Sequence, residues 1–213
     1  MSIRYLGLKV VNVDMEDREN ILTIQAKSTG LGNMAGMMDN TYQSYYKGAY
    51  LPDRYRKIIN QKKYNEDRLT SYDRIRQTAH RGSFISGSLS CDYRIYPECR
   101  DFFSALYYIR RHLDKPGKIY LDANGLIWTA EYKITGREEI DTFYGSEEAF
   151  IVDIRFKKIS EGSSERSDML TNNLVNEENI LTFWIAVTDN RLPLKARYSK
   201  KPFPVFWILE SYE

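Results

Sequence analysis

The feature that most constrains this chain is a two-residue alternation of apolar and polar side chains that recurs along most of the sequence. Leu22, Ile24 and Ala26 alternate with Thr and Gln, as expected for a strand with one buried face. The same alternation occupies 149–159. Side chains of a strand point to opposite faces in turn, whereas a helix would require a period near 3.6. The pattern therefore predicts a mainly β protein.

Two hairpins are predicted from their turn chemistry. The first spans 118–134 and turns at Asn124-Gly125, a pair that readily adopts the positive φ angles of a tight hairpin. The second spans 180–198, and Pro193 soon after its turn favours an edge or a strand start because proline cannot donate to a sheet. Further strands are expected at 83–89 and 202–209, an exposed hairpin at 55–76, and a mobile loop at 161–168.

One segment departs from the β pattern and predicts a helix at 101–112. Its apolar side chains recur at helical spacing, Asp101 suits the N-cap, and Arg110 suits the negatively polarised C-terminal end. A single helix in a sheet protein typically covers an open barrel end or a concave face. The predicted fold is therefore all-β: a curled antiparallel sheet or open β-barrel with one helix around residues 101–112, forming a single domain over 1–213.

Charge and hydropathy disfavour several classes of partner. The chain has 31 basic and 29 acidic residues, well interspersed, so no strong field for nucleic acid is expected. The basic, Tyr-containing stretch at 54–57 is better interpreted as the solvated face of a strand pair. No apolar run approaches the ~20 residues of a membrane-spanning helix. Residues 1–20 also lack the apolar core of an export signal, which taken alone indicates a cytoplasmic protein.

The helical segment also carries a family resemblance. Residues 101–110 (DFFSALYYIR) resemble the D-x-x-S-x-L-Y-Y-x-R signature of a bacterial family known as domain of unknown function 3108. Residues 3–7 look like the opening strand of that family, 51–55 like its Leu-Pro-x-Arg segment, and 183–193 like its closing hairpin. Only the helix motif has moderate specificity.

The resemblance implies a curled antiparallel sheet or open barrel in a periplasmic or envelope-associated protein of Gram-negative bacteria, with no established activity. This chain departs from the family pattern at Phe102 and Phe103, where Pro-Leu is common, and in showing no export signal. The first departure leaves the expected fold intact, and the second leaves a cytoplasmic location open.

Residues that could perform chemistry are sparse, so the sequence favours a role without catalysis. Asp101 and Ser104 share one helical turn, but serine activation needs an adjacent base and His112 lies two turns further on. Helix capping explains the Asp-x-x-Ser spacing more simply. Cys91 and Cys99 could form a disulfide or remain two thiols. They lack the spacing of a zinc site, and we expect neither metal nor cofactor.

A binding role rests on aromatic residues in predicted strands. If their rings line the concave face of the sheet, they form an apolar groove for a lipid or an envelope polymer, and Arg110 could pair with an anionic head group. The candidate binding residues are Tyr107, Arg110, Trp128, Trp184 and Trp207. Ordinary core packing of the tryptophans is the competing interpretation.

Two other functions remain open. The chain could be a structural or assembly factor that joins an envelope protein partner through a sheet edge. It could also be a hydrolase whose site is assembled from distant residues such as His80, Asp101 and Ser104. The oligomeric state is not indicated by any feature of the sequence.

Overall fold

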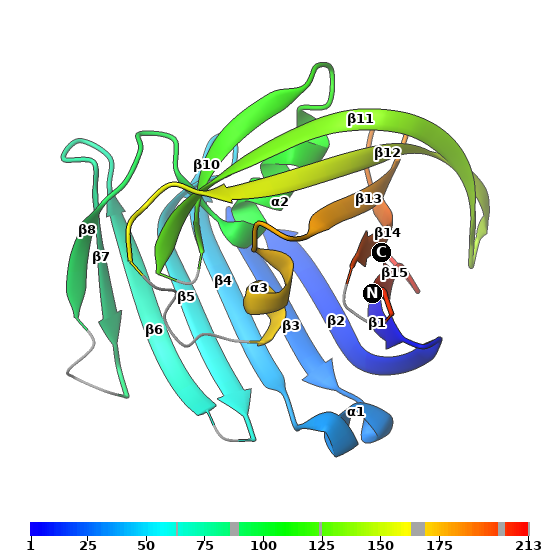
Figure 1. The fold of residues 1–213 in the computed structure, drawn as a ribbon, viewed down its shortest axis with the longest axis horizontal. Helices are drawn as coiled ribbons and strands as arrows, with labels where there is room; N and C mark the ends of the chain where they lie inside the picture. Colours follow the sequence, from blue (N-terminus) through cyan, green and yellow to red (C-terminus); the bar gives the residue numbers. More distant parts are fainter. Residues whose placement is uncertain (63, 86–89, 124, 163–168, 200–202, 213) are drawn as a thin grey trace.

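The computed structural model describes residues 1–62, 64–85, 90–123, 125–162, 169–199 and 203–212, and within these ranges its strands form one continuous curled sheet (Figure 1). The first strands are β1 (Ser2–Tyr5), β2 (Leu8–Arg18), β3 (Ile21–Ser28), β4 (Asp39–Lys47), β5 (Leu51–Gln61), β6 (Tyr64–Asp73), β7 (Thr78–Ser83) and β8 (Cys91–Arg94). The others are β9 (Arg100–Asp101), β10 (Gly117–Ala123), β11 (Leu126–Thr142), β12 (Gly145–Lys158), β13 (Ile180–Ala186), β14 (Pro193–Tyr198) and β15 (Val205–Ile208). The described residues also form three short helices: α1 (Gly30–Ala35), α2 (Phe102–Arg111) and α3 (Met169–Leu174).

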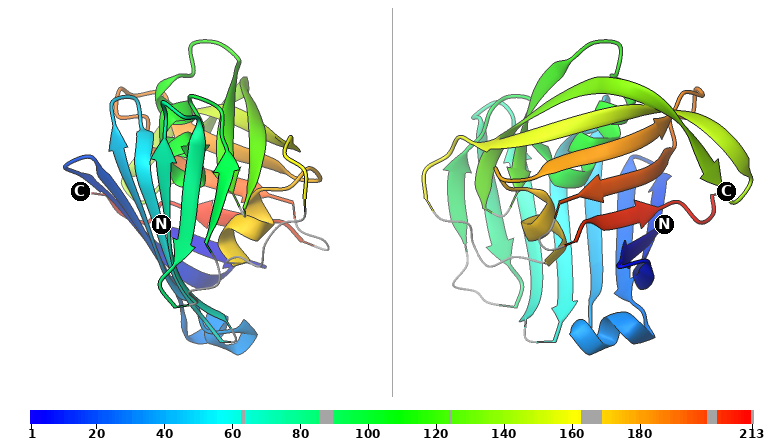
Figure 2. Two further views of the ribbon diagram at one scale, coloured as in Figure 1. Left: turned by 90° about the vertical axis from the view of Figure 1, so that its left-hand side faces the viewer. Right: turned by 45° about the vertical axis from the view of Figure 1, so that its right-hand side comes forward.

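The sheet is a meander whose chain ends are joined to each other. Its order is β8-β7-β6-β5-β4-β3-β2-β1-β15-β14-β13-β12-β11-β10-β9, so β1 pairs with β15 and the two edges are β8 and β9. Described neighbours pair antiparallel except β9 and β10, which are parallel. Figures 1 and 2 show the sheet curling around α2 and α3. The predicted curled antiparallel sheet is confirmed.

The alternation read from the sequence corresponds to the inner and outer faces of this sheet. Leu22, Ile24 and Ala26 of β3 are fully buried, while Gln25 and Lys27 between them are exposed. The hairpin at 118–134 is formed by β10 and β11, and β11 continues to Thr142 through a register shift at Gly136. The second predicted hairpin is formed by β13 and β14.

Two strand expectations need correction. The strand expected at 83–89 ends at Ser83 of β7, and Phe84 and Ile85 are exposed; 86–89 lie outside the described residues. The hairpin at 55–76 forms as β5 and β6, but one face of it is buried rather than exposed, with Tyr55 and Tyr72 in the core. Hydropathy did not reveal this inner face, because several of its buried positions carry charged or polar side chains.

Helix α2 follows the expected local rules. Asp101 caps it, accepting hydrogen bonds from the backbone amides of Phe103 and Ser104, and His112 is the C-cap. The loop expected at 161–168 lies mostly outside the described residues, as does Asn124 of the first hairpin turn, while its neighbour Gly125 has φ of 78°. Cys91 is an exposed free thiol and Cys99 a buried one.

A buried polar cluster ties the two ends of the sheet together, and we call it the clasp: Ser44, Tyr72, Tyr93, Asp101 and Asp122. Tyr93 of the edge strand β8 and Tyr72 of β6 donate hydrogen bonds to Asp122 of β10. Ser44 of β4 donates to Asp101 at the start of α2, at 2.6 Å. These bonds close the curl where the strands themselves do not pair.

Candidate ligand-binding site

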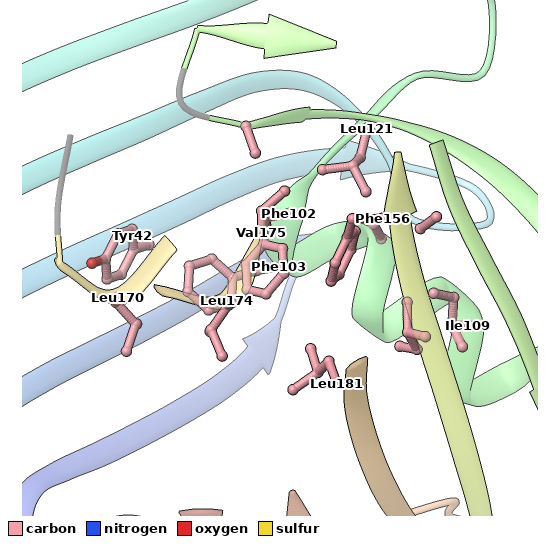
Figure 3. Packing of buried hydrophobic residues seen from close by; sticks show 14 of the residues in the cluster. Tyr42, Phe102, Phe103, Ile109, Leu121, Phe156, Leu170, Leu174, Val175 and Leu181 are labelled. Atoms are coloured by element: carbon pink, nitrogen blue, oxygen red, sulfur yellow. The ribbon is translucent and has the colours of Figure 1, made fainter. Parts of the chain in front are cut away.

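Inside the curl, α2 faces β2 and β13–β15 across an apolar hollow. We call it the Arg110 hollow and define it by Leu106, Arg110, Leu174, Phe183, Ile185 and Trp207. The empty space amounts to about 630 Å³ when its opening to solvent is included, of which a water molecule's centre can occupy about 40 Å³. The hollow is therefore narrow, with walls almost in contact across it. Figure 3 shows part of this packing, with Phe103, Ile109, Leu174 and Leu181 around the helix.

The helical wall of the hollow is one face of α2. Phe103, Leu106, Tyr107 and Arg110 are spaced i, i+3, i+4 and i+7, which places them on one stripe of a helix. Phe102 and Ala105 are buried in the main core and do not line the hollow, whereas Phe103 and Ile109 belong to the core and also line the hollow. The helix therefore contributes both a core-facing side and a cavity-facing side.

The sheet wall of the hollow follows from strand alternation. Leu181, Phe183 and Ile185 of β13 line it, because every second side chain of a strand points to the same face. Ala196 of β14 and Trp207 of β15 form a cross-strand pair and line it together. All of these side chains are apolar except for the indole N–H of Trp207.

Arg110 is the only charged side chain among the described residues that line the hollow. Its guanidinium lies over the ring of Tyr107, with Cζ 3.9 Å from the ring centroid. Within the described part of the chain, it makes no hydrogen bond or ion pair, and its Nε is buried without a partner. Buried donors in folded proteins are nearly always paired, so an unpaired one calls for a physical explanation.

Trp207 supplies a second donor of the same kind. Its side chain is 5% exposed, and its Nε1 is buried with no hydrogen-bond partner among the described residues. A buried indole N–H normally finds an acceptor. The hollow thus combines apolar walls with two side chains whose buried donors lack acceptors.

A group of tyrosines outside α2 holds Tyr107 in place. The ring of Tyr50 packs against Tyr107 with centroids 5.6 Å apart, and Tyr46 packs against Tyr50 at 4.8 Å. The hydroxyls of Tyr46 and Tyr50 donate to the carboxylate of Asp17 at 2.5 and 3.1 Å. Burial raises the pKa of Tyr107, Arg110 opposes that rise, and Asp17 adds to it. Tyr107 therefore stays neutral and serves as the surface on which Arg110 rests.

The family model described as "Protein of unknown function (DUF3108)" matches residues 2–202. The chain belongs to the DUF3108 family. The resemblance inferred from residues 101–110 is thereby confirmed, and those residues form α2, the wall that carries Tyr107 and Arg110.

Among solved structures, the DUF3108 chain is similar to a β-barrel-like protein of domain of unknown function DUF1849 from Brucella abortus. The TM-score is 0.63 at 6% sequence identity, and the match covers 96% of this chain and 88% of the other. At that identity the likeness concerns the fold alone. No curated protein matches the chain. No helix in the described ranges is long and apolar enough to cross a membrane.

Of the candidate residues in this DUF3108 chain, Tyr107, Arg110 and Trp207 come together at the hollow, and Trp128 and Trp184 lie elsewhere. Trp128 of β11 is buried in the main core and donates to the carbonyl of Ala123 at 3.1 Å. Trp184 belongs to a separate cluster on the opposite side of β13. Its Nε1 donates to Glu138 at 2.6 Å. Both have the partners expected of structural tryptophans.

The residues named for a hydrolase are not assembled into one site. Ser104 donates its hydroxyl hydrogen bond to Asp101 at 2.7 Å, and Asp101 is fully buried as part of the clasp. His80 instead faces solvent on β7. Asp101 therefore acts as a helix cap in this DUF3108 fold, as the Asp-x-x-Ser spacing predicts.

His80 lies between an aspartate and a serine, in the order found in a Ser-His-Asp catalytic triad. Its Nδ1 lies 2.7 Å from Asp92, and its Nε2 lies 3.4 Å from the hydroxyl of Ser90. The side chains of His80 and Asp92 are 57% and 77% exposed, and the two residues are direct cross-strand partners. A catalytic triad works in a site that excludes water and offers donors to an oxyanion. His80 and Asp92 are therefore better explained as an exposed cross-strand pair with Ser90 nearby.

Several residues of the site were not anticipated from the sequence. Tyr107 is supported by Asp17 of β2, Tyr46 of β4 and Tyr50 of the β4–β5 turn. Phe183 lines the opposite wall. The inward position of Phe183 follows from the alternation in β13. The positions of the two tyrosines depend on which strands neighbour α2, and no spacing in the sequence encodes that.

Proposed function

We propose that this protein binds an anionic amphiphile with a single apolar chain, whose tail lies in the Arg110 hollow and whose head group pairs with Arg110. The observation that carries the proposal is Arg110, which is half-buried at an apolar hollow and whose buried Nε has no hydrogen-bond partner among the described residues. Ligand sites are typically apolar clefts with a few convergent polar groups.

The chemistry of the walls supports a tail that is a simple hydrocarbon. Apart from Arg110, the described side chains that form the walls are aliphatic and aromatic. A carboxylate head suits Arg110, because a guanidinium binds carboxylate oxygens through charge-assisted hydrogen bonds.

The narrow hollow requires its side chains to move apart when a tail enters. Leu106 and Met15 lie on its wall, are only half-buried, and have flexible side chains. A hydrocarbon entering between them replaces contacts between walls with contacts to the ligand. The burial of the tail itself supplies the driving force, at about 25 cal/mol per Å².

The test measures binding of palmitate by displacement of a fluorescent fatty acid from the purified full chain. We expect Arg110→Gln to weaken palmitate binding by about tenfold or more, the value of one charge-assisted hydrogen bond. Arg111→Gln is the matched control, because Arg111 is exposed and donates to the carbonyl of Asp189. The affinity of the Arg111→Gln variant for palmitate should stay within about twofold of that of the unaltered protein.

Hexadecanol separates the contribution of the head from that of the tail. It carries the same chain without a charge, so its affinity should change little in Arg110→Gln. Absence of palmitate binding by the unaltered protein, or equal losses in the Arg110 and Arg111 variants, would overturn the proposal.

The cell envelope is where we propose that this binding takes place. The likeness of residues 101–110 to a family of exported proteins supports that location. Fractionation of cells that express the tagged natural protein tests it, and recovery in the cytoplasmic fraction alone would contradict it. The alternative role in envelope assembly has less support, because the edge strand β8 is short and carries Asp92 and Arg94, as in edges that avoid pairing.

A further inference from the structure

A second hollow lies directly beyond the first, inside the same curl. We call it the distal hollow and define it by Ile3, Val10, Met38, Leu170, Tyr198 and Val205. Its empty space is about 970 Å³ with the opening to solvent included, and a water molecule's centre can occupy about 320 Å³ of it. It is thus considerably roomier than the Arg110 hollow, and its lining is also mainly apolar.

Strand register shows how close the two hollows are. The cross-strand pair Ala196–Trp207 lines the Arg110 hollow, and the next inward pair on the same strands, Tyr198–Val205, lines the distal hollow. Residues two apart on a strand are separated by about 7 Å. The hollows are therefore neighbours along β14 and β15.

Helix α3 forms the opposite side of the boundary. Leu174 lines the Arg110 hollow and Leu170, one turn earlier, lines the distal hollow. Side chains four residues apart lie on the same face of a helix, so one face of α3 contributes to both spaces. Figure 1 shows α3 inside the curl of the sheet.

We propose that the two hollows form one binding path for a long acyl chain, with the head at Arg110 and the end of the tail in the distal hollow. This inference rests on the proposed function and adds selectivity for chain length. A short chain fills only the Arg110 hollow, whereas a long chain passes between α3 and the β14–β15 pair into the larger space. Burial raises the pKa of Tyr198 to about 12, which is consistent with an apolar wall at the crossing.

The decisive variant partly fills the distal hollow and leaves the Arg110 hollow unaltered. Val10 is half-buried and lines only the distal hollow, so Val10→Phe places a ring in its empty space. Val187→Phe is the matched control, because Val187 is also half-buried and lines neither hollow. Val10→Ile is a smaller, graded version that tests the same space if the phenylalanine variant folds poorly.

The experiment measures the dissociation constants of octanoate and palmitate for each variant. We expect Val10→Phe to weaken palmitate binding by about tenfold and octanoate binding by less than about twofold. Val10→Ile should produce a smaller loss with the same selectivity, and Val187→Phe should change neither affinity.

The outcomes separate this inference from the proposed function. If octanoate and palmitate both bind through Arg110 but lose affinity equally in the Val10 variants, or lose none, the path into the distal hollow is wrong and the Arg110 site stands. If neither ligand binds the unaltered protein, the proposed function itself fails.

Discussion

The clasp lies at the N-terminal end of α2 and Arg110 in its last turn, and the two regions differ in how fully their buried polar groups are hydrogen-bonded. In the clasp, Asp101 accepts from two backbone amides and from the hydroxyls of Ser44 and Ser104. In the hollow, Arg110 and Trp207 hold buried donors that lack acceptors among the described residues. A satisfied polar network stabilises and specifies a fold, whereas isolated donors in apolar surroundings suit a ligand.

The two regions also differ in how tightly the sheet is held. Near the clasp, the guanidinium groups of Arg74 and Arg100 donate to the backbone carbonyls of Cys99 and Glu98 beside the edge strand β9, and Arg100 also donates to the carbonyl of Ala49 in the β4–β5 turn. Among the described residues that line the hollow, the side chains pack through aliphatic and aromatic contacts, and Arg110 lies over the ring of Tyr107. The clasp therefore adds hydrogen bonds across the closure of the curl, whereas the lining of the hollow depends mainly on apolar packing.

The largest predicted effect breaks the clasp at Asp101. Asp101→Ala should lower the free energy of unfolding by about 3 kcal/mol, because it removes the cap of α2 and leaves the hydroxyls of Ser44 and Ser104 without their acceptor. Asp101→Asn keeps the capping oxygen and should cost about 1 kcal/mol. Urea unfolding measures both variants. Equal costs for the two substitutions would show that capping does not explain the role of Asp101.

A pair of arginines sharpens the comparison. Arg100 is 3% exposed, donates to the carbonyls of Ala49 and Glu98, and lies 3.8 Å over the ring of Tyr108. Arg100→Gln should therefore lower the free energy of unfolding by about 2 kcal/mol. Arg110→Gln should cost less, about 0.5–1 kcal/mol, because it removes the contact with the Tyr107 ring but no hydrogen bond. Thermal and urea unfolding of both variants test the contrast, and a larger loss at Arg110 would contradict a ligand role for that residue.

The pH dependence of stability tests the clasp at Asp122. Burial raises the pKa of Asp122, and the charge of Arg81 and the hydrogen bonds from Tyr93 and Tyr72 only partly oppose the rise. Above the ordinary Asp value of about 3.9, the native state then binds more protons than the unfolded state. The contribution of this group to stability is therefore present at low pH and is lost as pH rises through the raised value.

Asp122→Asn removes that titration without a large change in shape. We expect the stability of the unaltered protein, relative to Asp122→Asn, to fall as pH rises above the ordinary Asp range. Urea unfolding of both proteins across that interval measures the difference. A difference that is constant, or that grows with pH, would show that the pKa of Asp122 is not raised.

Much of the fold was predictable because it follows local rules. The alternation in β3 and β12, the hairpin of β10 and β11, and the Asp101 cap of α2 each depend on neighbours in sequence. The strand expected beyond Ser83 failed because an apolar pair, Phe84 and Ile85, looks the same in a strand and in an exposed bend. Hydropathy alone cannot distinguish these cases.

The candidate site was predictable only in part, for a physical reason. The spacing of Arg110 and Tyr107 shows that they share one face of a helix. For a tryptophan in a strand, the sequence does not show which face of that strand points into the curl. Trp184 illustrates this, since it alternates with Phe183 and Ile185 and so lies away from the hollow. The clasp depends on β8 and β10 meeting across the curl, a contact between residues distant in sequence.

The smallest predicted effect concerns the exposed relay of His80, Asp92 and Ser90, which belongs to neither region. Because His80 and Asp92 are largely exposed, His80→Ala should change the free energy of unfolding by less than about 0.5 kcal/mol, the range of a solvent-screened pair. The hydroxyl of Ser90 lies 3.4 Å from His80, too distant for a strong hydrogen bond. We therefore expect no labelling of Ser90 by a fluorophosphonate probe, with Ser90→Ala as the control. Labelling that disappears in both Ser90→Ala and His80→Ala would show an activated serine, and the preference for a binding role would then have to be reconsidered.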